Sequence, residues 1–236
     1  MQPDYTCPSC GAAVKFQSSV TLSTVCIYCR SLLVRHGIDL TLLGTMSELP
    51  MDISPFQIGT AGKYVDAHFS IIGRMRIGWE DGAWNEWFLL FEDARKAWLA
   101  EAQGFLAISF EFKETLPQKT QDILSSPDIQ LGTQVSLDGA MYTVADMKQA
   151  ECIGSEGELP FVAAKGRKTR VIDLIGRDGR FASVEVDKDG TLRVYTGAYV
   201  TFDALRFTNL RELPGWKVTR SNSTATPKAE KPDAGW

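Results

Sequence analysis

Four of the five cysteines stand in two similar pairs near the N-terminus, CPSC and CIYC, with fifteen residues between the pairs. Each C-x-x-C motif places two thiolates on one tight turn, and a second such turn completes a tetrahedron of sulfur ligands. The spacing predicts a zinc ribbon that holds one structural Zn²⁺ per chain. Because four thiolates fill the coordination sphere, we expect the metal to stabilise the fold and not to catalyse. The predicted ligands are Cys7, Cys10, Cys26 and Cys29.

The alternative for these cysteines is a pair of disulfides, which the rest of the sequence does not favour. The first residues show no basic segment followed by an apolar run, so we expect no secretory signal. No apolar run approaches the ~20 residues that span a bilayer. We therefore expect a cytoplasmic protein whose thiols stay reduced. His36 is predicted to lie on the surface, His68 to be a half-exposed residue of a strand, and Cys152 to be a buried thiol.

Alternation of apolar and polar residues dominates the chain from about residue 55 onwards. The segment SIIGRMRIGWE alternates as a half-buried strand does, and the following Asp81-Gly82 pair favours a hairpin turn. The segment WNEWFLLFE is apolar on both faces, which is typical of a central strand. Further Asp-Gly pairs separate the later strands. The sequence therefore predicts a mainly β protein.

The predicted strands fall into two groups that resemble each other. Ile58-Gly59-Thr60 matches Leu131-Gly132-Thr133, and at the same offset Phe69 matches Tyr142 and Phe88 matches Phe161. After the zinc ribbon we therefore predict two small related antiparallel β-barrel or meander units. The predicted divisions are the ribbon (1–37), a connector (38–54), the first β unit (55–116), a second connector with a short helix (117–128), the second β unit (129–213) and a disordered tail (214–236).

Four of the six tryptophans crowd around the Asp81-Gly82 turn. We expect Trp79, Trp87 and Trp98 to pack in the core of the first unit, because their strands are apolar, and Trp84 to reach solvent just after the turn. If this hairpin recognises a ligand, its edge is the candidate binding surface. That surface comprises Glu80, Asp81, Trp84, Asn85 and Glu86.

The chain carries a net charge of −4, and its middle is acidic. No nucleophile–histidine–acid set is evident, so we predict a non-enzymatic accessory or adaptor that binds protein. The first alternative is a nucleic-acid-binding zinc-ribbon protein, which requires a basic face joining Lys15, Arg30 and Arg35 to the KGRKTR segment at 165–170. The second is an enzyme that uses the tryptophan- and carboxylate-rich hairpin region. It requires a cavity holding His68, or two carboxylates with raised pKa values beside tryptophans.

Several segments together resemble a known family: GWEDGAWNEWFLLFED, WLAEAQG, SEGELPF, IGRDGRFASVEV and TGAYVTFDALRFTNLRE. They are similar to the bacterial domain-of-unknown-function family 4178 over most of residues 55–213. The resemblance implies a cytoplasmic β-rich protein with a partner or accessory role, and some members carry an N-terminal zinc ribbon. It supplies no catalytic residues for this chain.

Overall fold

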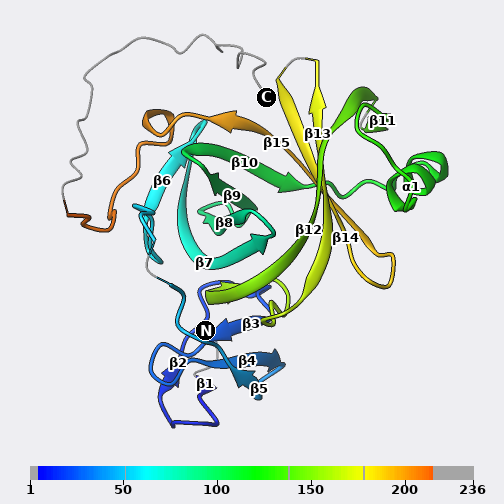
Figure 1. Cartoon of the computed structure of the whole chain (residues 1–236). Coiled ribbons are helices and arrows are strands. Elements are labelled where there is room, and N and C mark those ends of the chain that lie inside the picture. The colour runs from blue at the N-terminus through cyan, green and yellow to red at the C-terminus, as the bar shows by residue number, and fades with distance from the viewer. Residues whose placement is uncertain (1–4, 51, 138, 178, 215–236) are drawn as a thin grey trace.

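The computed structural model describes residues 5–50, 52–137, 139–177 and 179–214. Within these ranges the chain is mostly antiparallel β-sheet, as predicted (Figure 1). The described helices are α1 (Gln118–Ser125), which lies in the predicted second connector, and the short 3-10 helix η1 (Asp203–Leu205). Neither is long or apolar enough to cross a membrane. The predicted disordered tail lies almost wholly outside the described residues.

The N-terminal region forms a small β-ribbon. Its strands are β1 (Tyr5–Thr6), β2 (Ala13–Val14), β3 (Ser23–Val25), β4 (Ser31–His36) and β5 (Asp39–Thr45). Strand β5 lies in the segment predicted as a connector, because the chain turns at Gly37 and pairs back on β4. Apolar side chains such as Phe16 and Leu33 pack directly against the cysteines, so the ribbon has a small core of its own.

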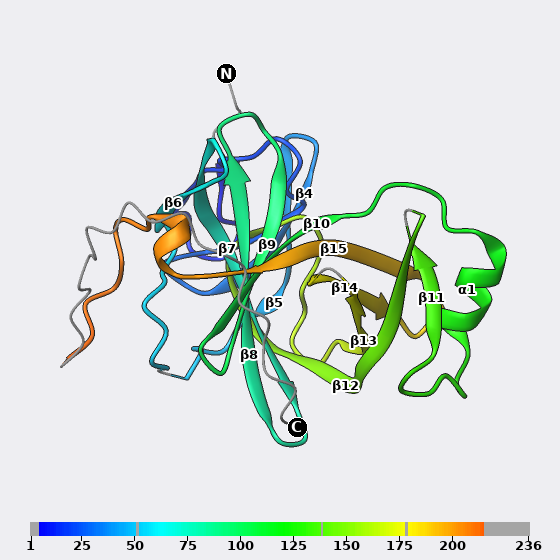
Figure 2. The same ribbon diagram turned by 90° about the horizontal axis from the view of Figure 1, so that it is seen from above.

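The remaining strands form two five-stranded meanders, which lie side by side in Figure 2. The first contains β6 (Ala61–Tyr64), β7 (Ala67–Trp79), β8 (Gly82–Phe91), β9 (Lys96–Ala102) and β10 (Phe105–Glu111). The second contains β11 (Gln134–Leu137), β12 (Ala140–Leu159), β13 (Lys168–Gly176), β14 (Arg180–Val186) and β15 (Leu192–Val200). In both, each strand pairs antiparallel with the next, so the two units share one strand order.

The first hairpins of the two meanders have the same register. Phe69 pairs with Gly62 in one and Tyr142 pairs with Val135 in the other, as the predicted match requires. Three backbone hydrogen bonds recur at the same offset. In the first meander the N–H groups of Gly59, Thr60 and Ile71 donate to the carbonyls of Ile71, Gln57 and Thr60. In the second, the N–H groups of Gly132, Thr133 and Val144 donate to the carbonyls of Val144, Gln130 and Thr133. A β-bulge follows at Ile72 in β7 and at Ala145 in β12. The repeat is therefore present in the backbone.

The predicted match of Phe88 with Phe161 is wrong. Phe88 lies within β8, whereas Phe161 lies beyond the end of β12, in the connection to β13. Strand β12 is much longer than β7, because it continues past its pairing with β13, pairs next with β7 and ends on β3 of the ribbon. This extension adds residues that have no counterpart in the first meander, so the constant offset ends there.

The two meanders join each other along two edges. Strand β10 pairs with β15, and β7 pairs with the second half of β12. Among the described strands, pairing therefore runs round a closed ring of eight: β7, β8, β9, β10, β15, β14, β13 and β12. The two related units are parts of one continuous sheet, and closure leaves none of these eight strands with an open edge.

Successive side chains of a strand point to opposite faces, so both faces of the ring carry apolar side chains and the molecule has several hydrophobic cores. In β8, Trp87 and Leu89 enter the core of the first meander, whereas Phe88 enters a core shared between the meanders. Leu205 and Phe207 also pack in the first meander's core, although their segment was predicted to belong to the second unit. A third core lies inside the second meander, against α1. Strand β8 is thus covered on both faces, as its sequence predicted.

Candidate functional site

The four N-terminal cysteines converge in space. Their sulfur atoms all lie within 4.8 Å of one another, with 3.6 Å between Cys7 and Cys29 and 3.8 Å between Cys10 and Cys26. A tetrahedral Zn²⁺ with Zn–S bonds of about 2.3 Å places its sulfurs about 3.8 Å apart. None of the four forms a disulfide. The cluster has the composition and size of a tetrahedral metal site, and it can hold a metal ion.

The two cysteine pairs are presented by turns of the same construction. In each turn the first cysteine donates its N–H to the residue five positions on, and its carbonyl accepts the N–H of the residue four positions on. That fourth residue has a positive φ in both turns, 75° at Gly11 and 61° at Arg30. Glycine suits this conformation, whereas Arg30 is additionally held there by a hydrogen bond to the carbonyl of Ser47. Both turns therefore aim two sulfurs inward.

The residues of the predicted hairpin surface do not form one surface. Glu80 and Asp81 are exposed at the turn between β7 and β8. Trp84 and Glu86 line a cavity inside the strand ring, whereas Asn85 points to the opposite face and is buried. This separation follows from strand geometry, because successive side chains of β8 point to opposite faces.

The four clustered tryptophans divide in the same way. Trp87 and Trp98 are buried, as predicted, but they belong to cores on opposite faces of the sheet. Trp79 is only partly buried, and its ring lies 5.3 Å from that of Trp84, centroid to centroid. Trp87 and Trp98 thus pack on opposite faces of the same meander, because side chains alternate along the strands.

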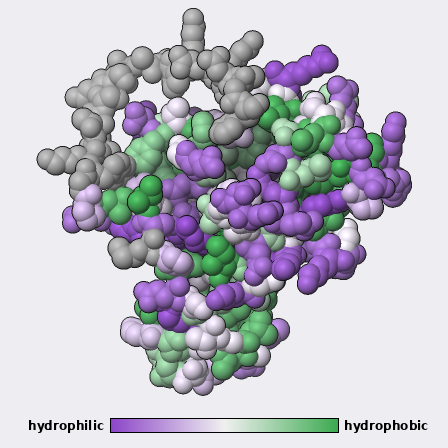
Figure 3. All heavy atoms as spheres, viewed as in Figure 1, coloured by the Kyte–Doolittle hydropathy of each residue, from purple (hydrophilic) through white to green (hydrophobic). Residues whose placement is uncertain are grey.

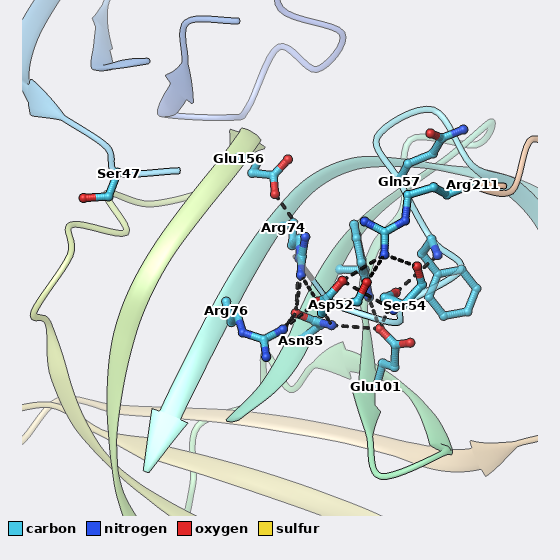
Figure 4. A network of polar contacts seen from close by, with 12 residues as sticks. Ser47, Asp52, Ser54, Gln57, Arg74, Arg76, Asn85, Glu101, Glu156 and Arg211 are labelled. Carbon is cyan, nitrogen blue, oxygen red and sulfur yellow. Dashed lines mark hydrogen bonds and ion pairs between the residues drawn. The ribbon is translucent and has the colours of Figure 1, made fainter. Parts of the chain in front are cut away.

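Asn85 belongs to a polar network centred on Asp52 (Figure 4). The Asp52 carboxylate binds the guanidinium groups of Arg74, Arg76 and Arg211. The side chains of Arg74 and Asp52 are only 5% and 9% exposed. Burial alone raises the pKa of Asp52, but Arg74, Asn85 and Arg211 outweigh it, so the pKa is lowered below its ordinary value.

Glu101 extends this network to the inner wall of the first meander. Its Oε2 accepts hydrogen bonds from Ser54 Oγ at 2.7 Å, Asn85 Nδ2 at 2.9 Å and Trp87 Nε1 at 3.0 Å. The Arg74 guanidinium also lies over the Trp87 ring, 4.7 Å from its centroid. The network therefore fastens the segment after the ribbon to the strand ring, and it explains why an asparagine sits between two tryptophans in β8.

A cavity of about 260 Å³ lies inside the strand ring and is lined by residues from all eight ring strands. Aromatic side chains form much of its wall, including Trp79, Trp84, Trp98, Tyr195 and Tyr199. Its polar groups include the carboxylates of Glu86 and Asp173. The cavity was not predicted from the sequence, because the residues that line it come together only when the two meanders close into a ring.

The carboxyl groups of Glu86 and Asp173 in the cavity both have raised pKa values. Burial, with a smaller contribution from the nearby acids Glu185 and Asp173, raises the pKa of Glu86 to about 8 against the opposing hydrogen bond from Trp84. That bond joins Trp84 Nε1 to Glu86 Oε1 at 2.7 Å. Burial also raises the pKa of Asp173, although a hydrogen bond from Ser183 at 3.0 Å opposes the shift.

The raised pKa of Glu86 makes the stability of the fold depend on pH. Its ordinary value is 4.5, so the protonated carboxyl stabilises the folded state fully below about pH 4.5. That contribution is lost as pH rises through about 8. We expect the free energy of unfolding to fall across this window by up to about 1.4 kcal/mol per pH unit. Denaturant titrations at several pH values measure the slope, which Glu86→Gln should reduce and the exposed control Glu92→Gln should keep.

Three arginines of the predicted nucleic-acid face are engaged by other groups of the molecule. Arg167 binds Asp187 at 2.7 Å and Glu185 at 3.3 Å. Arg170 donates to two backbone carbonyls beside α1, and Arg35 donates to three carbonyls of the ribbon. These arginines therefore bind other segments of this chain and hold them together.

The fold and the cysteine cluster define a mostly β protein in which a ribbon that can hold a metal ion is attached to a ring of eight strands. A family model described as "Domain of unknown function (DUF4178)" matches residues 57–202, a span that contains every strand from β6 to β15. The chain belongs to this family, as its sequence motifs indicated. No curated protein and no solved structure matches it.

Proposed function

We propose that this chain is a non-enzymatic, cytoplasmic accessory protein that binds a partner protein through its N-terminal ribbon, which one zinc ion holds in shape. Zinc is the metal that fits best, because four thiolates at tetrahedral spacing are a typical structural zinc site. Four coordinating sulfurs leave no position for substrate. The metal then serves to present the ribbon surface, and recognition falls to the side chains around it.

The observation that carries this proposal is the set of large apolar side chains that the ribbon exposes. Ile27 is 84% exposed, Ile38 is 79% exposed and Tyr28 is 71% exposed. Further members of the set are Val20, Leu22, Leu42 and Leu43. Green, apolar surface is visible over the lower lobe in Figure 3, where the ribbon lies. Exposed apolar groups in such number are typical of a protein-binding surface.

Strand β5 indicates what kind of partner this surface fits. Among the described strands it pairs only with β4, so its outer edge offers unpaired backbone groups. An extended partner segment can add to such an edge and cover the neighbouring leucines. Residues 5–37 contain no acidic residue, and Lys15 is an exposed basic side chain among them. The partner segment we propose is therefore an extended strand that is both apolar and acidic.

Affinity purification of the full-length chain from its native cells tests this proposal. We expect a protein to co-purify with the wild type and to be lost from the variant Ile38→Ser/Leu42→Ser. The control Ile175→Ser removes an isoleucine of β13 that is 47% exposed, close to the 46% of Leu42, and should retain the partner. Metal content, measured for each variant, should stay unchanged. Recovery of nucleic acid without protein, or equal recovery by all variants, contradicts the adaptor role.

One observation favours an enzyme as the second candidate. The ring cavity places Glu86 and Asp173, both with raised pKa values, beside Trp79 and Trp84. Acids of this kind suit proton transfer. We still favour a binding role, because burial raises the pKa of Cys152 to about 11, which makes its thiol a poor nucleophile. A compound from cell extract that is consumed by the wild type and spared by Glu86→Gln would reverse this preference.

A further inference from the structure

We propose that the cavity inside the strand ring binds a small organic ammonium ion. This site is separate from the ribbon surface and does not depend on it. The proposal concerns the chemistry of the cavity wall, and it holds whether the bound molecule is only retained there or also converted.

The charge of the wall favours a cation. Four carboxylates line the cavity against two basic side chains, Lys148 and Arg167. Both basic groups are already paired: Arg167 binds Glu185 and Asp187, and Lys148 binds Asp146. Glu185 is balanced by Arg167 and Arg193, and Glu151 is balanced by Lys168. Among the ion pairs of the described residues none includes Glu86 or Asp173, so these are the acids of the wall with which an incoming cation can pair.

The carboxylates of Glu86 and Asp173 are placed to accept a cation. Within the described structure, the one hydrogen-bond donor to Glu86 is the indole N–H of Trp84 and the one donor to Asp173 is the hydroxyl of Ser183. Neither carboxylate has a cationic hydrogen-bond partner. Both side chains are partly buried and line the cavity. A carboxylate with free acceptor capacity in such a site gains a partner when a cation reaches it, so these two groups mark where a bound cation gains most.

The aromatic wall selects an organic cation over a metal ion. Trp79 and Trp84 pack as a tilted pair, and Phe181 and Tyr199 pack 5.4 Å apart, centroid to centroid. Aromatic faces attract ammonium groups through the ring quadrupole and also accept the attached apolar groups. The chain already makes this contact at the cavity wall, because the ammonium of Lys148 lies over the Trp79 ring, 5.5 Å from its centroid.

The cavity volume and the acid chemistry set two further properties of the ligand. About 260 Å³ lies just below the usual range for small-molecule sites, so the ligand is small. With its pKa near 8, Glu86 is protonated in the empty cavity at neutral pH, and it releases that proton when a cation binds. Binding of a permanently charged ammonium should therefore strengthen as pH rises from about 6.5 to 8.5.

Three probes of one shape and different charge test the proposal on the full-length, zinc-loaded chain. They are choline, its neutral isostere 3,3-dimethylbutan-1-ol and the anion 3,3-dimethylbutanoate. Calorimetry measures affinity, and the fluorescence of Trp79 and Trp84 reports occupancy of the cavity. We expect choline to bind at least about tenfold more tightly than the neutral isostere, and the anion to bind most weakly.

Variants then locate the site. Glu86→Gln keeps the shape of the side chain and should weaken choline at least about tenfold and remove its pH dependence. Asp173→Asn provides a second, independent removal of charge should the first variant fail to fold, as judged by its unfolding curve. Glu92→Gln, an exposed acid of the first meander, should bind choline as the wild type does. Equal binding of choline and its neutral isostere, no binding of choline at millimolar concentration, or unchanged affinity in both acid variants overturns the proposal.

Discussion

Removal of the metal is expected to unfold the ribbon while the strand ring stays folded. The ribbon buries only a handful of apolar side chains, such as Val14, Phe16 and Leu33, around the cysteines. A core of this size does not stabilise some forty residues, so metal binding must supply the folding free energy, on the order of 10 kcal/mol for a structural zinc site. The variant Cys26→Ser and a strong chelator should therefore have the same effect.

Metal analysis and amide hydrogen exchange check this expectation. The purified wild type should contain about one zinc per chain, and Cys26→Ser should contain almost none. Without metal, amides of β1 to β5 should lose their protection, whereas those of β8, β9 and β14 should keep it. The matched control is Cys152→Ser, a cysteine outside the cluster, which should retain the metal. A protected ribbon in metal-free protein would contradict the structural role.

The contact between the ribbon and the end of β12 determines which part of the ring is affected when the ribbon unfolds. Glu158, at the end of β12, accepts hydrogen bonds from the backbone N–H groups of Gln17 and Ser18 and from the hydroxyl of Thr21. Burial raises the pKa of Glu158 despite these bonds. The ribbon is therefore docked on the ring by both a strand pairing and a buried carboxylate. When the ribbon unfolds, we expect only the end of β12 beyond its pairing with β7 to lose order.

Local patterns in the sequence predicted the features that neighbouring residues create. The cysteine spacing fixes which sulfurs can meet, because each pair shares one turn. The alternation in β7 and β8 fixes which side chains share a face, and it places Trp84 and Trp87 on opposite sides. The candidate surface did not follow this rule, since it joined adjacent residues of one strand into one surface.

The features that the sequence did not reveal depend on contacts between distant segments. Arg74 occupies a polar position in the alternation of β7, yet it is buried. Its environment is supplied by Asp52 and Glu156, far away in the chain, and no periodicity encodes such a meeting. The ring cavity arises in the same way, because it exists only where the second meander closes against the first.

Breaking the network at Asp52 is expected to be the most damaging single substitution outside the metal site. Asp52→Ala leaves the guanidinium of Arg74 buried beside Asn85 and Trp87 with one of its two carboxylate partners removed. Removing one partner of a buried ion pair costs about 3–5 kcal/mol, because the remaining charge is not solvated. Chemical denaturation of wild type and variant measures this loss. The exposed pair of Asp93 and Arg95 is the matched control, and Asp93→Ala should change the free energy of unfolding far less than Asp52→Ala does.

A second substitution separates two contributions to the loss of stability: the free-energy cost of leaving the Arg74 charge buried without Asp52, and the loss of the contacts that Asp52 makes. In Asp52→Ala/Arg74→Met the buried guanidinium is gone, so the double variant should be more stable than Asp52→Ala alone if desolvated charge causes the damage. The pH dependence has the opposite sign to that of Glu86. Because the folded-state pKa of Asp52 is lowered, its contribution is present above its ordinary pKa of 3.8 and is lost as pH falls through the folded-state value. A double variant no more stable than Asp52→Ala would mean that the network acts by packing, through the stacking of Arg74 on Trp87, and not through charge.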